Sequence, residues 1–151
     1  MVRLMPYDGR SNRYQNQDWC TKMSALLPGA VIFAKNVDKI AEFYRELFAL
    51  SEKIHDAGKV VLESDHFSVV VHGIPEEISE KIAISVPPEL RENTSIKLYL
   101  PVISIAEARQ KASKFGGGIK PENKEWQAAN FIACDGFDPE GNIFQVRQVA
   151  P

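Results

Sequence analysis

A repeated order of secondary-structure signals constrains the fold of this chain more than any other feature of its sequence. In the first copy, residues 29–35 follow Pro28 and are rich in β-branched and aromatic side chains, which predicts a buried strand. Asn36 and Asp38 suit the start of a helix, and apolar residues then recur at helical spacing as far as Leu50. Three more strands are expected near residues 52–56, 59–63 and 67–72.

The second copy has the same order. A strand is expected over residues 96–101, Ser104 and Glu107 have the spacing of a capping box, and the glycines at 116–118 end the helix that follows. The last strands are expected around Ile119 and over residues 128–135 and 142–149. One such unit is too small to bury its apolar face alone. The sequence therefore predicts an α+β fold, with two βαβββ modules in tandem that form a curved mixed sheet around a cleft.

These patterns divide the chain into expected parts. Residues 1–25 are expected to be an N-terminal arm or extension, and residues 26–151 one domain. Within that domain, module one covers residues 28–73, the connector residues 74–95 and module two residues 96–149. The connector contains three prolines, and its one apolar run, at 82–86, is expected to be a short extended piece. The arm is either a loose extension or a segment whose aromatic residues pack onto a partner subunit or cover a pocket.

Composition limits the possible partners. The chain is 44% hydrophobic and 25% charged, which is typical of soluble globular proteins. A formal net charge of −2 and the lack of a long Lys/Arg run argue against nucleic acid. No apolar stretch approaches the ~20 residues that span a membrane. Cys20 and Cys134 form neither a disulfide framework nor a zinc motif, so a reducing, cytoplasmic setting is expected, with Cys134 packed as a small hydrophobe.

Three segments carry a resemblance to a known superfamily. The first is a helix with a Phe-Tyr pair at residues 36–50, and the second is a helix that ends in glycines at residues 105–117. The third is an Asp-Pro-Glu-Gly-Asn turn at residues 138–142. In that turn Pro139 presets the backbone and Gly141 accepts a positive φ. Over residues 26–149 the chain resembles the vicinal oxygen chelate superfamily, which includes glyoxalases, bleomycin-resistance proteins and extradiol dioxygenases. Phe48 and Ala49 depart from the Leu-Gly ending of that superfamily's first helix.

The resemblance also implies where a metal ion would be bound, because metal-binding members take ligands from the first and last strands of each module. The implied positions are Gly29, Lys97, Gln145 and one near residues 70–72, where His72 could donate. Glycine has no side chain, an ammonium is a poor ligand, and two neutral donors hold a divalent ion weakly. No cofactor is therefore expected. The alternative is a divalent metal in a rearranged site, with donors from Glu63, His55 or His66.

Without a metal, the resemblance implies a cleft that binds a small aromatic or anionic ligand, as in bleomycin-resistance-like proteins. The expected ligand-binding residues are Phe33, Lys97, Tyr99, Trp126 and Gln145, with Ile143 and Arg147 beside them on the last strand. Plainer interpretations stay open. Tyr99 could be core, and Trp126 a loop residue or a dimer contact. Lys97 could pair with an acidic neighbour at the rim, and the Gln145 amide could bond to backbone.

Two other functions and one partner are compatible with the resemblance. The chain could be a glyoxalase-like lyase or isomerase, or a dioxygenase-related enzyme, with a rearranged metal site or with Lys97 as acid or base. It could also be a copy of the fold that acts only through its surface. Members with two modules in one chain usually pair symmetrically, so a homodimer is implied.

Overall fold

The first module is a four-stranded sheet with one helix against it. The computed structural model describes residues 26–151. The elements of the first module are β1 (Gly29–Ala34), α2 (Val37–Phe48), β2 (Ser51–Asp56), β3 (Lys59–Glu63) and β4 (Ser68–Gly73). The strand order is β1-β4-β3-β2, in which β1 runs parallel to β4 and the other neighbours are antiparallel. The predicted mixed sheet is therefore present, with β1 and β2 at its two edges.

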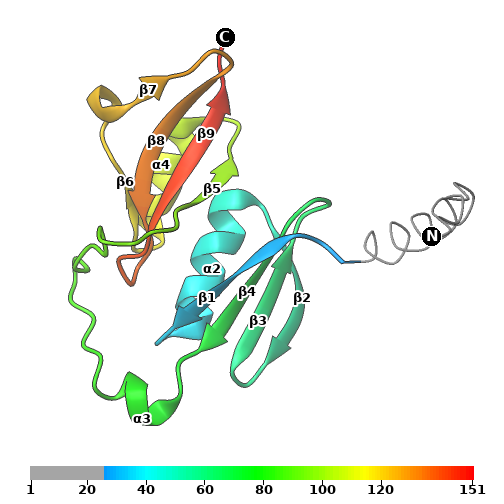
Figure 1. Cartoon of the computed structure of the whole chain (residues 1–151), viewed down its shortest axis with the longest axis vertical. Helices are drawn as coiled ribbons and strands as arrows, with labels where there is room; N and C mark the ends of the chain where they lie inside the picture. The colour runs from blue at the N-terminus through cyan, green and yellow to red at the C-terminus, as the bar shows by residue number, and fades with distance from the viewer. Residues whose placement is uncertain (1–25) are drawn as a thin grey trace, which may run out of the picture.

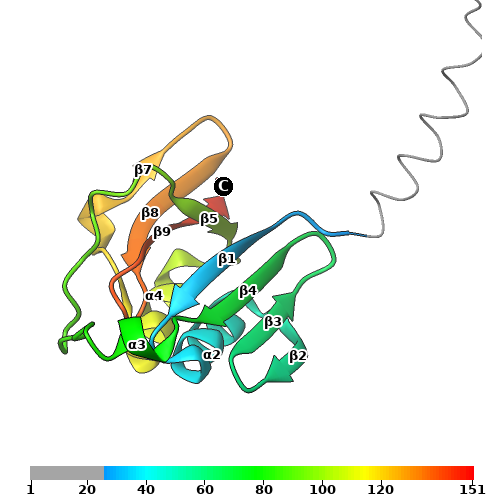
Figure 2. The same cartoon turned by 60° about the horizontal axis from the view of Figure 1, so that its bottom comes forward.

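The second module repeats this arrangement, and Figure 1 shows its sheet above that of the first. Its elements are β5 (Leu98–Pro101), α4 (Ile105–Lys114), β6 (Gly118–Ile119), the 3-10 helix η1 (Glu122–Lys124), β7 (Trp126–Gln127), β8 (Phe131–Phe137) and β9 (Ile143–Val149). The strand order is β5-β9-β8-β6, and β7 pairs with β8 beside that path. The strands of the described residues thus form two sheets, whose edge strands β1 and β5 adjoin each other (Figure 2).

Two local features differ from what the sequence patterns predict. The penultimate strand is present as β8, but it covers residues 131–137 and not 128–135: Ala128 donates its N–H to the Phe131 carbonyl oxygen at 2.9 Å, and this turn separates β7 from β8. The connector contains the short helix α3 (Glu76–Ser79), which was not expected, and its apolar run at residues 82–86 belongs to no helix or strand.

The helix boundaries follow the local signals. The Asn36 side-chain oxygen accepts a hydrogen bond from the Lys39 N–H at 3.0 Å, and the Ser104 hydroxyl accepts one from the Glu107 N–H at 3.2 Å. These bonds satisfy N–H groups that have no partner inside a helix. At the end of α2, Ala49 has a φ of 50°, the left-handed conformation in which glycine is usually found.

One hydrophobic core lies between the two modules. It contains buried residues of both helices and of the inner strands of both sheets. Phe43, Tyr44 and Phe48 of α2 pack their rings against Phe144 of β9, with centroid distances of 5.8, 6.1 and 5.7 Å. The modules therefore share their core, and neither helix buries its apolar face within its own module alone.

The turn at residues 138–142 ties the two modules together. The buried Glu140 carboxylate accepts hydrogen bonds from the backbone N–H groups of Lys35 at 3.0 Å and Asn36 at 2.7 Å, where β1 passes into α2. Gly141 has a φ of +83°, as the turn pattern predicts, and its N–H donates to the Asp138 carbonyl oxygen at 2.9 Å. The turn that carries the resemblance thus holds the end of the first strand of the other module.

Among residues 26–151, no helix has the length and apolar character that crossing a membrane requires.

Candidate functional site

Two of the predicted site residues meet at one carboxylate. The Lys97 ammonium lies 2.8 Å from Asp135 Oδ2, and the Gln145 amide donates to Asp135 Oδ1 at 3.3 Å. Asp135 of β8 lies directly opposite Gln145 of β9 in the antiparallel register, and Lys97 immediately precedes β5. Lys97 is thus a partly exposed residue paired with an acidic neighbour. Asp135 was not among the predicted residues, although a carboxylate within the apolar run of β8 was a signal that could have found it.

The strand register shows which residues of the first module correspond to this pair. Tyr99 lies two residues after Lys97 and pairs with Gln145 in the second sheet. Val31 lies two residues after Gly29, the corresponding position of the first module, and pairs with Val70 in the first sheet. The counterpart of Gln145 is therefore Val70, which has no donor atom. His72 lies two pairs further along, opposite Phe33, and its Nδ1 lies 2.9 Å from the Gly73 carbonyl oxygen.

The remaining implied position, Gly29, has no room for a side chain. A β-carbon there would lie 2.3 Å from the Ser68 carbonyl oxygen, so any larger residue would push β1 away from β4. In the part of the chain that the structure describes, no three His, Cys, Asp or Glu side chains gather in a way that could hold a metal ion. The residues at the implied positions do not fit the metal site of the superfamily.

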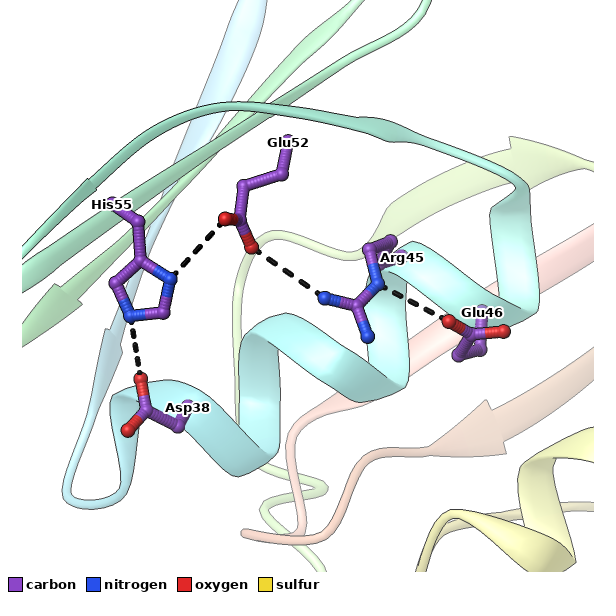
Figure 3. Close-up of polar contacts among 5 residues, drawn as sticks. All are labelled: Asp38, Arg45, Glu46, Glu52 and His55. Atoms are coloured by element: carbon purple, nitrogen blue, oxygen red, sulfur yellow. Dashed lines mark hydrogen bonds and ion pairs between the residues drawn. The ribbon is translucent and has the colours of Figure 1, made fainter.

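The donors of the suggested rearranged site lie at two separate places, with His55 on β2 and with Glu63 and His66 at the turn between β3 and β4. His55 lies against α2, where its two ring nitrogens contact Asp38 at 3.1 Å and Glu52 at 3.2 Å (Figure 3). Glu63 is at the end of β3, opposite Ser68. His66 is in the turn between β3 and β4. The fold therefore does not bring these three side chains together.

Gln145 is hydrogen-bonded to an arginine that packs against aromatic rings of the second sheet. The Arg147 Nε–H donates to the Gln145 side-chain oxygen at 2.8 Å. The Arg147 guanidinium carbon lies 3.6 Å from the centroid of the Tyr99 ring and 4.4 Å from that of Phe131. The Trp126 ring meets the Phe131 ring edge to face, with centroids 5.5 Å apart. Tyr99 and Trp126 are both about half exposed, so neither is a core residue.

A mostly apolar hollow lies at the seam between the edge strands β1 and β5, and we call it the seam cavity. Its volume is about 590 Å³. It is lined by Gly29, Ala30, Phe48, Leu50, Ser64, His66, Phe67 and residues 96–101. Lys97 and Tyr99 are therefore on its wall. Phe33, Trp126 and Gln145 are not, and the half-exposed Phe33 ring instead meets the His72 ring edge to face at 5.8 Å.

Cys134 is buried in the core, as its packing as a small hydrophobe requires. Burial raises the pKa of its thiol, and its Sγ donates to the Lys120 carbonyl oxygen at 3.4 Å. A raised thiol pKa reduces the thiolate population, which is the nucleophilic form.

Known proteins resemble this chain in structure rather than in sequence. Comparisons with protein-family models and with curated protein sequences found no match. A glyoxalase/bleomycin resistance protein/dioxygenase family enzyme from Burkholderia phytofirmans PsJN superposes with a TM-score of 0.60 at 14% identity, covering 81% of this chain and 97% of that one.

Two further solved structures have the same architecture. A glyoxalase-related enzyme from Fulvimarina pelagi matches with a TM-score of 0.57 at 15% identity, covering 82% of this chain and 87% of its own. The fosfomycin resistance protein FosX from Listeria monocytogenes matches with a TM-score of 0.56 at 14% identity, covering 82% of this chain and 92% of its own. At such identities the likeness concerns the fold. The chain has the α+β fold of the vicinal oxygen chelate proteins.

Proposed function

We propose that this chain binds a small organic molecule with a flat, apolar body in the seam cavity, without a metal ion. The observation that carries the proposal is the cavity itself. Its volume of about 590 Å³ is within the range of roughly 300–1,000 Å³ that small-molecule sites occupy. Because its walls come from both modules, the site exists only when the two modules are packed together.

The chemistry of the walls supports this kind of ligand. Phe48, Phe67 and Tyr99 bring aromatic rings to the cavity, and aromatic side chains pack well against flat apolar groups. Lys97 and His66 add polar atoms at the wall. A mostly apolar surface with a few polar groups is typical of sites that bind a ligand in one orientation.

The proposal is tested by filling the cavity. Ala30 is partly buried and lines the cavity, so Ala30→Leu should occupy the space that the ligand needs. The probe is naphthamide, which is neutral, flat and mostly apolar, and binding is measured by isothermal titration calorimetry. We expect naphthamide to bind the wild-type protein and to bind Ala30→Leu at least tenfold more weakly.

The matched control is Ala30→Ser, which keeps the cavity open at the same backbone position and should retain binding. The melting temperature of Ala30→Leu should not fall, because a larger side chain in an apolar cavity adds buried surface. Failure of naphthamide to bind the wild type, or equal affinity for wild type and Ala30→Leu, would contradict the proposal.

We also propose that a second copy of the chain covers the exposed face of the first sheet. Val31 and Ile54, which are 58% and 44% exposed, lie in one row across this sheet with Val61 and Val70. Phe33 extends the apolar surface and is 59% exposed. A face of this kind pairs with itself in symmetric dimers.

Sedimentation equilibrium at micromolar concentration is expected to show a dimer, and Val31→Lys is expected to shift it to monomer. The control is Ile78→Lys, because Ile78 is as exposed but belongs to α3 of the connector. A wild-type protein that is only monomeric under these conditions would disprove the dimer.

A further inference from the structure

Arg147 has only part of its hydrogen-bonding capacity satisfied. A guanidinium carries five N–H donors. Its Nε–H donates to Gln145, and the amide of Gln145 in turn donates to Asp135, so the direction of the arginine side chain is set by a chain of hydrogen bonds. Among residues 26–151, no partner accepts a hydrogen bond from the two terminal nitrogens of Arg147.

The rings of Tyr99 and Phe131 contact the guanidinium through its carbon, at 3.6 and 4.4 Å from their centroids. Stacking of this kind uses the flat faces of the group and leaves the donors at its edge available. The stacking also restricts the side chain before a ligand arrives, which lowers the entropy cost of binding. Arg147 is therefore held in place, and none of the residues 26–151 uses its terminal donors.

In the part of the chain that the structure describes, no carboxylate balances the positive charge of Arg147. The Asp135 carboxylate contacts Lys97 through one oxygen and Gln145 through the other. No ion pair within the described range 26–151 includes Arg147. Lys97, one of the expected ligand-binding residues, carries a positive charge, but this charge is paired with Asp135. Arg147 is only partly exposed, and a partly buried cation is stabilised by an anion.

We propose that Arg147 binds the anionic group of the ligand, and that the ligand is a small organic molecule with a carboxylate, phosphate or phosphonate group. The terminal N–H groups of a guanidinium match two oxygens of such a group. Tyr99 contacts Arg147 and also lines the seam cavity, so an anion at Arg147 can have its apolar body against that cavity. This inference rests on the proposed binding function and assigns the chemical class of the ligand.

The test compares two probes of nearly the same shape. Naphthoate carries a carboxylate, and naphthamide carries a neutral amide in its place. Isothermal titration calorimetry should show that naphthoate binds the wild-type protein at least tenfold more tightly than naphthamide, because hydrogen bonds to charged groups are the stronger ones. Arg147→Gln should remove this preference, so that the two probes bind the variant with equal affinity. Arg147→Lys should keep roughly a threefold preference, because it keeps the charge but loses the paired donors.

The matched control is Arg45→Gln on α2, where the arginine contacts Glu46 and Glu52 of the first module (Figure 3). It should retain the full preference for naphthoate. Far-UV circular dichroism and the melting temperature show whether each variant is folded. A second measurement does not depend on the cavity: inorganic phosphate should shift the Arg147 Nε–H resonance in nitrogen-15 NMR spectra.

Each outcome decides the inference. Equal binding of the two probes by the wild type, or an unchanged preference in Arg147→Gln, would overturn the role of Arg147 and leave the cavity proposal intact. If naphthamide fails to bind but phosphate shifts the Arg147 resonance, the anion site stands and the cavity proposal falls. If neither probe binds and phosphate causes no shift, both are overturned.

Discussion

Asp138 accepts four hydrogen bonds although its side chain is fully buried. The donors are the Tyr44 hydroxyl at 3.1 Å, the Glu140 N–H at 2.9 Å, and the N–H and side-chain amide of Asn142 at 3.0 and 2.8 Å. Burial raises the pKa of Asp138, and the hydrogen bonds act in the opposite direction. Burial and the nearby Asp138 charge raise the pKa of Tyr44, so its hydroxyl keeps the proton that it donates.

Tyr44→Phe should therefore destabilise the protein. The substitution removes a donor from a buried carboxylate, and a hydrogen bond to a charged group contributes about 1.5–3 kcal/mol. The free energy of unfolding from urea titration measures the loss. Tyr99→Phe is the control, because Tyr99 is about half exposed, and it should change stability by less than about 0.5 kcal/mol. An equal effect of the two substitutions would show that the buried bond contributes nothing.

Ala49 has a backbone conformation that suits glycine better. Its φ is 50°, and a non-glycine residue in the left-handed region costs about 1–2 kcal/mol. Part of the gain from Ala49→Gly is lost because glycine is more flexible in the unfolded chain. We expect a net stabilisation of up to about 1 kcal/mol in urea titrations. The same substitution at the exposed helical Ala106 should instead cost about 1 kcal/mol, so the two changes should have opposite signs.

At the scale of secondary-structure elements, a chain of charged side chains links β2 to α2. His55 of β2 contacts Asp38 at the start of the helix and Glu52 on its own strand, and Glu52 also contacts Arg45 at 3.5 Å (Figure 3). The hydrogen bond to Glu52 is the largest cause of a raised His55 pKa, and the Glu52 charge and Asp38 also raise it against a smaller opposing effect of burial. The protonated imidazole is thus the form that the folded state favours.

This link should make stability depend on pH. A histidine whose pKa is higher in the folded than in the unfolded state stabilises fully below its unfolded pKa, and the contribution is lost as pH rises through the folded pKa. The stability difference between wild type and His55→Gln should therefore be larger at about pH 5 than at about pH 9. Urea titrations at both values measure it, with His66→Gln as control, since His66 makes no side-chain hydrogen bond within residues 26–151. Parallel pH profiles for wild type and His55→Gln would refute the link.

At the scale of the whole molecule, the two modules are held together by a shared core and by Glu140. This residue contacts backbone more than one hundred positions earlier in the chain. Its carboxylate satisfies two N–H groups at the junction of β1 and α2 while it is itself only 4% exposed. The connection fixes the first module against the turn of the second, and the seam cavity depends on that placement.

Glu140→Ala should cost about 2–4 kcal/mol, because it leaves two N–H groups without their acceptor. Glu140→Gln should cost less, since the amide oxygen can still accept one bond. Unfolding in urea, followed by circular dichroism, should remain a single transition for the wild type because the core is continuous. The exposed Glu122→Ala should change stability by less than about 0.5 kcal/mol. Two separate transitions in the wild type would contradict a shared core.

The sequence alone was enough to predict the two long helices, most of the strands and the α+β fold with its two modules, but not α3, η1 or β7. The starts of the helices at Asn36 and Ser104 and the turn at Gly141 depend on residues close together in the chain, so local patterns reveal them. The start of β8 at Phe131, three residues later than expected, and the separate strand β7 before it were not predicted. The ends of a strand depend on its pairing with segments at other places in the chain.

The candidate site was decided by the tertiary structure. The contacts of Lys97 and Gln145 with Asp135 depend on the register of β8 and β9, and the placement of Arg147 between Tyr99 and Phe131 depends on three strands meeting in one sheet. The seam cavity depends on how two edge strands of different modules adjoin. The sequence determined the residues and the elements that carry them, whereas the neighbours and free donors of each side chain were determined only by long-range packing, which no local pattern encodes.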